Sequence, residues 1–281
     1  MSTITRSTVA RVLPRVTLTL TLALAVGQAS AAVTYHVQLD TTRFGHLNQA
    51  NVPLPPGGGG QNSCVPTAVV NSFVWLQNVN PTLLGNDLLA GGTLAQNASN
   101  LGENFMGSTS TNGTSANGWI DGKVDWVMTR AAGRVNVVGQ SRLYNGGFNG
   151  MADVAPTWQF LFSNLTLGAG IELGILPNAG GIGHAITLTS FHWTDQNMDG
   201  VIQMGENATL DFIDPAAPAN VSIVSVFQDA MGRLQTNYGG GQGYNVALAV
   251  AQVAVPTPSG VGLASIAVLI AARRRRVPSQ A

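Results

Sequence analysis

Cys64 is the only cysteine among the 281 residues of this chain. A lone thiol cannot form an intramolecular disulfide, so the thiol needs another reason to be present, and no such bridge holds the fold. The residue opens an apolar stretch that runs to Leu76, and the spacing of its apolar residues predicts a helix. Four of them fall on one face of that helix: Val65, Val69, Phe73 and Leu76.

The predicted helix places Cys64 at its N-terminal end, with Ser63 as the cap residue and Pro66 in the first turn. Unpaired backbone N–H groups and the helix macrodipole at this end favour a thiolate over a thiol. A nucleophilic cysteine requires that environment. The alternative is a buried structural cysteine, which is the commonest role of a free thiol.

The N-terminal residues 1–32 are typical of a secretory signal peptide. Three arginines (Arg6, Arg11 and Arg15) precede an apolar run over residues 16–26, and small residues occupy positions 29–31. We expect cleavage near Ala31 or Ala32, and therefore export of the mature chain.

The C-terminal residues 255–281 combine a Pro-Thr-Pro motif, about a dozen apolar residues at 261–272 and four arginines at 273–276. The apolar run is shorter than the roughly 20 residues that a membrane-spanning helix needs. The tail resembles the PEP-CTERM sorting signal of bacteria, with Thr257 where that family usually has Glu. The resemblance implies transient membrane retention, removal by an exosortase-type enzyme and a location at the cell surface or in the extracellular matrix. A weak single-pass anchor is the alternative.

The charge of the mature region differs from that of the whole chain. Three of the 13 Lys and Arg residues lie in the leader and four in the tail, which leaves six against all 13 Asp and Glu residues, a net charge near −7. A body poor in basic residues argues against a nucleic-acid partner, because binding phosphates needs clustered Lys and Arg. Residues 33–254 are enough for one domain with a substantial core.

The order of predicted elements indicates an α+β fold. After a strand at 33–39 and a Pro/Gly-rich loop at 53–60, helical patterns dominate the first half of the chain and strand patterns dominate the second. The predicted helices cover residues 64–76, 83–90, 94–105 and 119–130, with another within 151–167. The predicted strands cover residues 135–138, 168–176, 209–214, 221–227 and 245–253, together with one that starts at His184.

Two further residues complete a pattern typical of thiol hydrolases. His184 follows Gly183 at the start of a predicted strand, and Asp214 lies between Ile213 and Pro215 at the end of another. Cysteine, histidine and acid in this order match papain-like enzymes. A histidine in an apolar strand is otherwise a core or edge residue, and an Asp before Pro is a common turn residue.

Four segments carry a more specific resemblance: residues 61–76, 160–176, 183–188 and 212–215. They are similar to successive landmarks of the bacteriocin-processing-type cysteine peptidases, family thirty-nine of the papain-like superfamily. The resemblance implies a papain-like fold, with the nucleophile at a helix N-terminus packed on a mostly antiparallel sheet.

By the same resemblance, Cys64 is the nucleophile, His184 the base, and Asp214 the residue that orients the imidazole. Two positions depart from the family, which usually has Gly where this chain has Val65 and an oxyanion-stabilising Gln where this chain has Gly58. Gln61, three residues before the nucleophile, is the candidate for that role, with Asn62 as the alternative donor.

A second motif lies between His184 and Asp214. Residues 195–206 match the twelve-position calcium loop D-x-N-x-D-G-x-I-x-x-x-E, with Gly200 at the sharp turn and Ile202 pointing inward. The expected calcium ligands are Asp195, Asn197, Asp199, the Val201 carbonyl, Gln203 and Glu206. Predicted strands flank the loop, so we expect a calcium ion that stabilises the fold rather than a signalling EF-hand. The alternative is a metal-free surface turn.

These features predict a secreted or surface-retained cysteine peptidase-like hydrolase that acts on a peptide or protein substrate. A catalytically inactive surface-binding or matrix-binding module with the same fold is the principal alternative. An acyltransferase of the transglutaminase type would use the same residue types. The sequence has no phosphate-binding loop, dinucleotide fingerprint or zinc motif.

Overall fold

The computed structural model describes residues 32–56, 60–89, 91–179, 183–240 and 243–255. The predicted leader and tail lie outside the described residues, apart from Ala32 and Val255. Within the described ranges, no helix combines the length and the apolar character that crossing a membrane requires.

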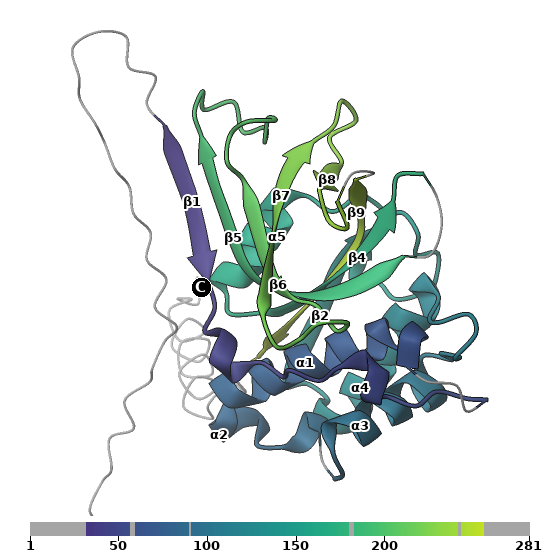
Figure 1. Cartoon of the computed structure of the whole chain (residues 1–281). Coiled ribbons are helices and arrows are strands. Elements are labelled where there is room, and N and C mark those ends of the chain that lie inside the picture. The colour runs from purple at the N-terminus through teal and green to yellow at the C-terminus, as the bar shows by residue number, and fades with distance from the viewer. Residues whose placement is uncertain (1–31, 57–59, 90, 180–182, 241–242, 256–281) are drawn as a thin grey trace, which may run out of the picture.

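Six strands form a closed antiparallel barrel (Figure 1). Consecutive barrel strands are hydrogen-bonded neighbours, and the ring closes because β4 pairs with both β5 and β9. The barrel strands are β4 (Gly170–Pro177), β5 (His184–Asp195), β6 (Thr209–Ile213), β7 (Val221–Gln228), β8 (Leu234–Thr236) and β9 (Tyr244–Ala254).

Three more strands extend the sheet beyond the ring. β1 (Val33–Gln38) pairs antiparallel with β5, and β2 (Val135–Ser141) pairs antiparallel with β9. The two-residue strand β3 (Met151–Ala152) pairs parallel with β2.

Most helices gather at one side of the barrel, where α1 to α4 lie beneath it in Figure 1, while α5 lies against strands of the barrel. The α-helices are α1 (Cys64–Val79), α2 (Pro81–Leu84), α3 (Leu94–Asn100), α4 (Ala116–Ala131) and α5 (Trp158–Thr166). Short 3-10 helices are η1 (Thr41–Arg43), η2 (Gln49–Asn51), η3 (Gly60–Asn62) and η4 (Asp87–Leu89), and η5 (Leu101–Phe105) is a π-helix.

This architecture corrects the expected fold class. The α+β, papain-like prediction was wrong, because the sheet closes into a six-stranded antiparallel barrel with three additional strands. The predicted strands are largely present, but strand periodicity reports only which side chains share a face. Closure depends on the pairing of β4 with β9, which joins strands that are distant in sequence, and no local pattern indicates this pairing.

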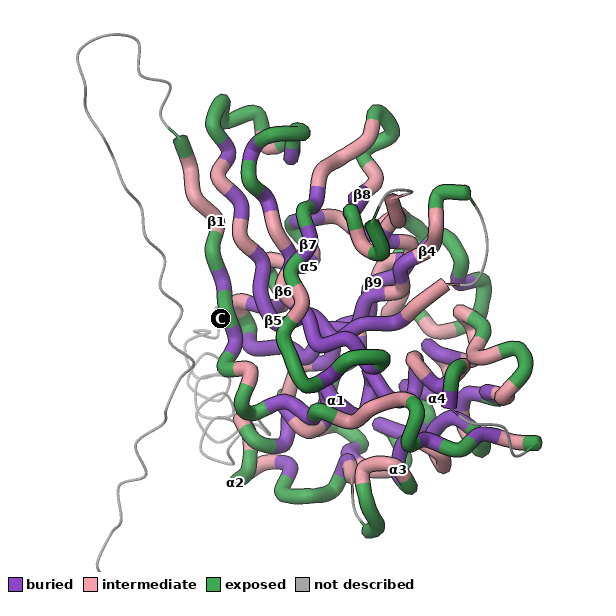
Figure 2. The backbone as a smooth tube through the Cα atoms, in the orientation of Figure 1, coloured by how far each residue is buried: buried purple, intermediate pink, exposed green. Residues whose placement is uncertain are grey.

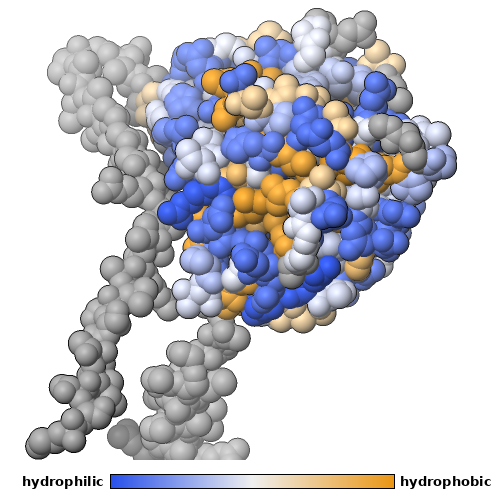
Figure 3. Space-filling view, turned by 60° about the horizontal axis from the view of Figure 1, so that its bottom comes forward, coloured by the Kyte–Doolittle hydropathy of each residue, from blue (hydrophilic) through white to orange (hydrophobic). Residues whose placement is uncertain are grey.

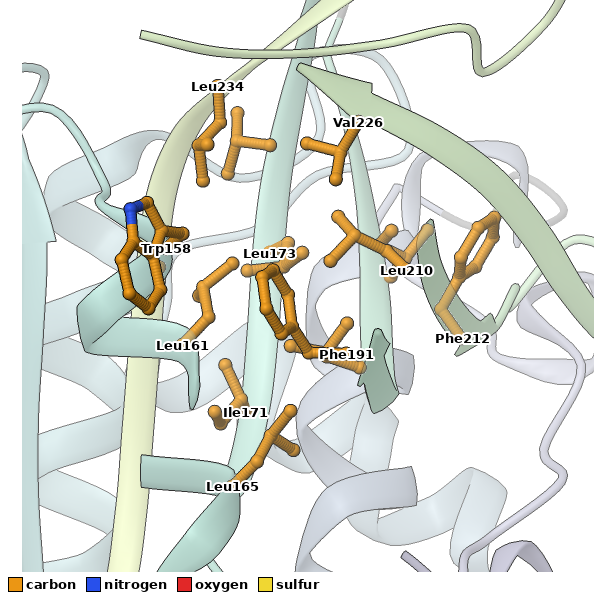
Figure 4. Packing of buried hydrophobic residues seen from close by; sticks show 14 of the residues in the cluster. Trp158, Leu161, Leu165, Ile171, Leu173, Phe191, Leu210, Phe212, Val226 and Leu234 are labelled. Carbon is orange, nitrogen blue, oxygen red and sulfur yellow. The ribbon is translucent and has the colours of Figure 1, made fainter. Parts of the chain in front are cut away.

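The alternation of side chains along β4 divides the interior into two cores. Ile171, Leu173 and Ile175 face a cluster to which every barrel strand contributes, together with α5, so this cluster fills the ring (Figure 4). Glu172 and Gly174 face the helices. Figure 2 accordingly shows long buried stretches along β4, β5 and β9, because these strands are covered on both faces.

The second core lies between the helices and the sheet, and α1 is buried along almost its whole length. At its centre the single lysine of the chain, Lys123 of α4, is fully buried and ion-paired with Glu172 of β4. Lys123 also donates to Gln252 of β9, and Ser72 of α1 donates to Glu172. Gln252 completes the network by donating to the Ser72 hydroxyl over 2.7 Å.

This network joins four elements through charged and polar groups that have lost their water. Burial lowers the pKa of Lys123, and the charge and hydrogen bond of Glu172 oppose that shift. The position of α1 relative to β4 and β9 therefore depends on a pair in which each charge neutralises the other.

We predict that Lys123→Met destabilises the fold by about 3–5 kcal/mol, because it leaves the Glu172 carboxylate buried without a counter-charge. The free energy of unfolding from urea titration measures the change. The double variant Lys123→Met/Glu172→Leu removes both charges and should recover most of the loss. Equal stability of the wild type and Lys123→Met would contradict the prediction.

Candidate functional site

Cys64 is the first residue of α1 and is partly exposed. Ser63 occupies the N-cap position, as the sequence predicted, but its side chain makes no capping hydrogen bond to the helix. Its hydroxyl instead donates to the Gly60 carbonyl over 2.7 Å. The Ser63 carbonyl accepts from the backbone N–H of Thr67. Cys64 thus stands at the N-terminus of a helix whose body is anchored in the second core.

His184 is the first residue of β5, and one hydrogen bond ties its strand to the helix that carries Cys64. The Thr187 hydroxyl donates to the Ala68 carbonyl of α1 over 3.0 Å, one turn beyond Cys64. His184 and Cys64 line the same cavity. The structure therefore brings together the thiol and the imidazole that the sequence singled out.

Asp214 follows β6 directly and reaches His184 because β5 and β6 are paired. His184 Nε2 lies 2.8 Å from Asp214 Oδ1, which also accepts from the Ala216 backbone N–H. The Asp214 carbonyl accepts from Ala217 N–H, so the residue is part of a turn as well. The two roles that the sequence left open for Asp214 coexist.

Tyr238 is a site residue that the sequence analysis missed. Its hydroxyl donates to Asp214 Oδ2 over 2.7 Å. Its ring stacks on His184 with centroids 5.7 Å apart and planes 24° from parallel. Tyr238 lies in a glycine-rich turn after β8, and nothing in that local pattern indicates contact with a histidine 54 positions earlier.

The carboxylate and the imidazole stabilise one another's charged forms. Burial favours the neutral ring of His184, but hydrogen bonds and charges from Asp214 and Cys64 outweigh it and raise the pKa of His184 to about 9. Burial alone would raise the pKa of Asp214, yet the hydrogen bond and charge of His184, with help from Tyr238 and Ala216, lower it. An imidazolium beside an ionised Asp214 is the result.

The oxyanion candidate Gln61 lies in η3 and lines the cavity with Cys64 and His184. Its carbonyl accepts from the Gln49 side chain over 3.2 Å, whereas its exposed side-chain amide has no hydrogen bond within the described part of the chain. The neighbouring Asn62 donates its amide to the Ser110 carbonyl over 2.6 Å. Gln61, and not Asn62, thus has a free amide at the cavity, and Gly58 lies outside the described residues.

The cavity beside Cys64 has a volume of about 300 Å³. Its walls come from the first turns of α1 and α4, the C-terminal part of β4, the start of β5, the interior of β9 and loop residues that include 112–114. In the space-filling view, hydrophobic side chains gather near the middle of one face of the molecule, bordered by hydrophilic ones (Figure 3). The apolar residues of the cavity wall are Val65, Ala116, Trp119, Leu143, Ile175, Leu176, Ala247 and Leu248.

The predicted calcium loop joins β5 to β6, and strands flank it as expected. The Asp195 carboxylate is buried and accepts the backbone N–H groups of Met198 and Gly200 over 2.6 and 3.0 Å. Gly200 has a φ of 73°, which suits glycine at the turn. Ile202 is fully buried and exchanges hydrogen bonds with Gln228 of β7.

The other predicted side-chain ligands fall into two hydrogen-bonded groups, one at Asp199 and one at Glu206. Asp199 accepts from the side chains of Asn197 and Gln203. Glu206 is buried and accepts from Trp193 Nε1 and from the Gln203 backbone. Val201 is half-exposed at 44%. In the described residues no three His, Cys, Asp or Glu side chains converge as a preformed metal site.

A scan against protein-family models found no match to this chain, and a search of the curated proteins found none either.

We predict that the pKa of His184 falls by more than one pH unit in Asp214→Asn, because the hydrogen-bonded negative charge is lost while burial remains. Titration of the His184 ring nitrogens by NMR measures this. Tyr238→Phe, which keeps the carboxylate, should leave the pKa of His184 raised. The same pKa of His184 in the wild type and Asp214→Asn would contradict the assignment.

The same shift predicts how stability changes with pH. The pKa of His184 is about 9 in the folded protein and ordinarily 6.5, so proton binding favours the folded state. This contribution, on the order of 3 kcal/mol, is complete below pH 6.5 and is lost as the pH rises from 6.5 through 9. The unfolding free energy of the wild type should therefore fall over this window more than that of His184→Gln.

Proposed function

We propose that this protein is a cysteine hydrolase that cleaves amide bonds of peptides or proteins through Cys64, His184 and Asp214. One observation carries the proposal: Cys64 and His184 line one cavity, and His184 is hydrogen-bonded to Asp214. The predicted leader and tail support an exported, surface-retained setting for this activity.

In the proposed reaction, each residue has a step. His184 holds the thiol proton as an imidazolium, whose charge Asp214 stabilises, and the Cys64 sulfur attacks the carbonyl carbon. Backbone N–H groups at the start of α1 and the free amide of Gln61 are the available donors for the oxyanion. The carbon–nitrogen bond then breaks, and His184 gives its proton to the departing amine.

The remaining thioester is resolved by water. His184, now neutral, removes a proton from a water molecule as its oxygen attacks the thioester carbonyl. Loss of the sulfur as the leaving group releases a carboxylic acid, and the proton held by His184 returns to Cys64. Tyr238 touches none of the reacting atoms; it holds Asp214 and covers one face of the His184 ring.

Alkylation of the single thiol tests the proposal on the intact protein. We predict that a small chloroacetamide reagent labels Cys64 at least about 100-fold more slowly in His184→Ala than in the wild type, because the base that removes the thiol proton is absent. His192→Ala, which changes another histidine of β5, is the matched control and should react like the wild type. Labelling that does not depend on His184 would instead favour the inactive surface-binding module.

We also propose that the loop at residues 195–206 binds a calcium ion. The buried Asp195 carboxylate, the turn at Gly200 and the buried Ile202 and Glu206 support this proposal. Oxygen atoms of Asp195, Asn197, Asp199, Val201, Gln203 and Glu206 would hold the ion. The loop connects β5 to β6, so the ion would stabilise the two strands on which His184 and Asp214 depend.

We predict that calcium at about 100 times its dissociation constant stabilises the protein by about 2.7 kcal/mol, which corresponds to a rise in melting temperature of about 5–10 °C. Calorimetry with calcium and with a chelator measures the shift. Asp199→Asn removes one charge from the exposed part of the loop and should abolish most of the calcium-dependent rise in melting temperature. Asp153 is exposed and lies outside the loop, so Asp153→Asn is the control and should retain the full calcium-dependent rise in melting temperature. Superimposable melting curves would remove the calcium proposal.

A further inference from the structure

We propose that the cavity beside Cys64 is a subsite for one large apolar side chain, carried by the substrate residue whose carbonyl the thiol attacks. The inference rests on the proposed hydrolase function and names its substrate class: peptides with an aliphatic or aromatic residue at the cleaved bond. Charged residues at that position are excluded.

The composition of the wall points to an apolar occupant. Cys64 and His184 are the only titratable side chains among the described residues that line the cavity. The polar remainder consists of uncharged amides and one hydroxyl, from Gln61, Asn62, Asn112 and Thr114. A charged substrate side chain would lose its water there and gain no opposite charge in return, which makes its transfer unfavourable.

The size of the cavity suits a single side chain. Its volume of about 300 Å³ lies at the lower end of the roughly 300–1,000 Å³ that small-molecule pockets span. One leucine or phenylalanine side chain fits within this volume. Because the reacting thiol is part of the same wall, an occupant of the cavity lies next to the sulfur.

Gly174 of β4 helps to keep the space open. A Cβ at this position would lie 3.2 Å from Leu248 Cβ and 3.2 Å from Trp119 Cζ3, both of which line the cavity. The pairing of β4 with β9 also shifts register between Gly174 and Ile175. Any larger residue at position 174 would therefore press on two walls of the subsite.

Leu143 gives the subsite an apolar side chain that can be changed without disturbing a core. It lines the cavity but is 47% exposed, and it follows β2 outside the two buried clusters. A carboxylate at this position would place a charge beside the bound side chain. Leu167, at the end of α5 and 66% exposed, does not line the cavity and provides a matched control.

The test uses N-acetyl amino-acid chloromethyl ketones that carry leucine, phenylalanine, glycine, glutamate or lysine side chains. The Cys64 sulfur displaces chloride from the methylene carbon, the thiol proton held by His184 is released to solvent with the chloride, and a thioether remains. Because the chain has one cysteine, the intact mass gives the adduct directly. The second-order alkylation rate of the full protein is measured for each reagent.

We expect the leucine and phenylalanine reagents to react about 10- to 100-fold faster than the glycine reagent, since their side chains leave water for an apolar wall. The glutamate and lysine reagents should react no faster than the glycine reagent. Leu143→Glu should reduce the advantage of leucine over glycine at least fivefold, and Leu167→Glu should leave it unchanged. Gly174→Ala should reduce the advantage of phenylalanine more than that of leucine.

Two failures are distinguishable. If alkylation depends on His184 but all five reagents react alike, or if Leu143→Glu and Leu167→Glu have the same effect, the subsite proposal is wrong and the hydrolase proposal stands. If His184→Ala does not slow any reagent, the hydrolase proposal itself fails and the subsite fails with it.

Discussion

The double pairing of β4, with β5 on one side and β9 on the other, is the constraint on which the rest of the structure depends. It closes the barrel, so one face of β4 belongs to the interior of the ring and the other must be covered by helices. The buried pair of Lys123 and Glu172 lies on that second face and holds α4 against the strand. The same face receives α1, and with it the N-terminus that carries Cys64.

Barrel closure and the candidate catalytic site are linked through two strand ends. His184 begins β5 and Asp214 follows β6, so the register of this antiparallel pair fixes the distance between imidazole and carboxylate. The bond from Thr187 to Ala68 fixes α1 against β5 in turn. None of the three catalytic candidates needs a flexible loop to reach the others, and this preorganisation is what acyl transfer to a thiol requires.

The sequence predicted local features well and non-local ones poorly. The helix that begins at Cys64, the strand that begins at His184 and the turn at Asp214 follow from residue types and spacing. Ring closure depends on which strand lies beside β4, and strand periodicity carries no information about neighbours. The sequence did not predict Tyr238 as a site residue for the same reason, because only the folded barrel brings the turn after β8 to the Asp214 carboxylate.

The proposed calcium loop and the candidate catalytic site lie at opposite ends of β5. The strand has 12 residues, so His184 and Asp195 are separated by roughly 36 Å along its path at about 3.3 Å per residue. At that separation an ion cannot polarise the thiol or the imidazole, and its charge is screened beyond roughly 10 Å in salt solution. Any effect of calcium on catalysis must then pass through the stability of the β5–β6 pair. The dependence of activity on calcium should consequently follow that of folding, without a separate change in the reactivity of the folded thiol.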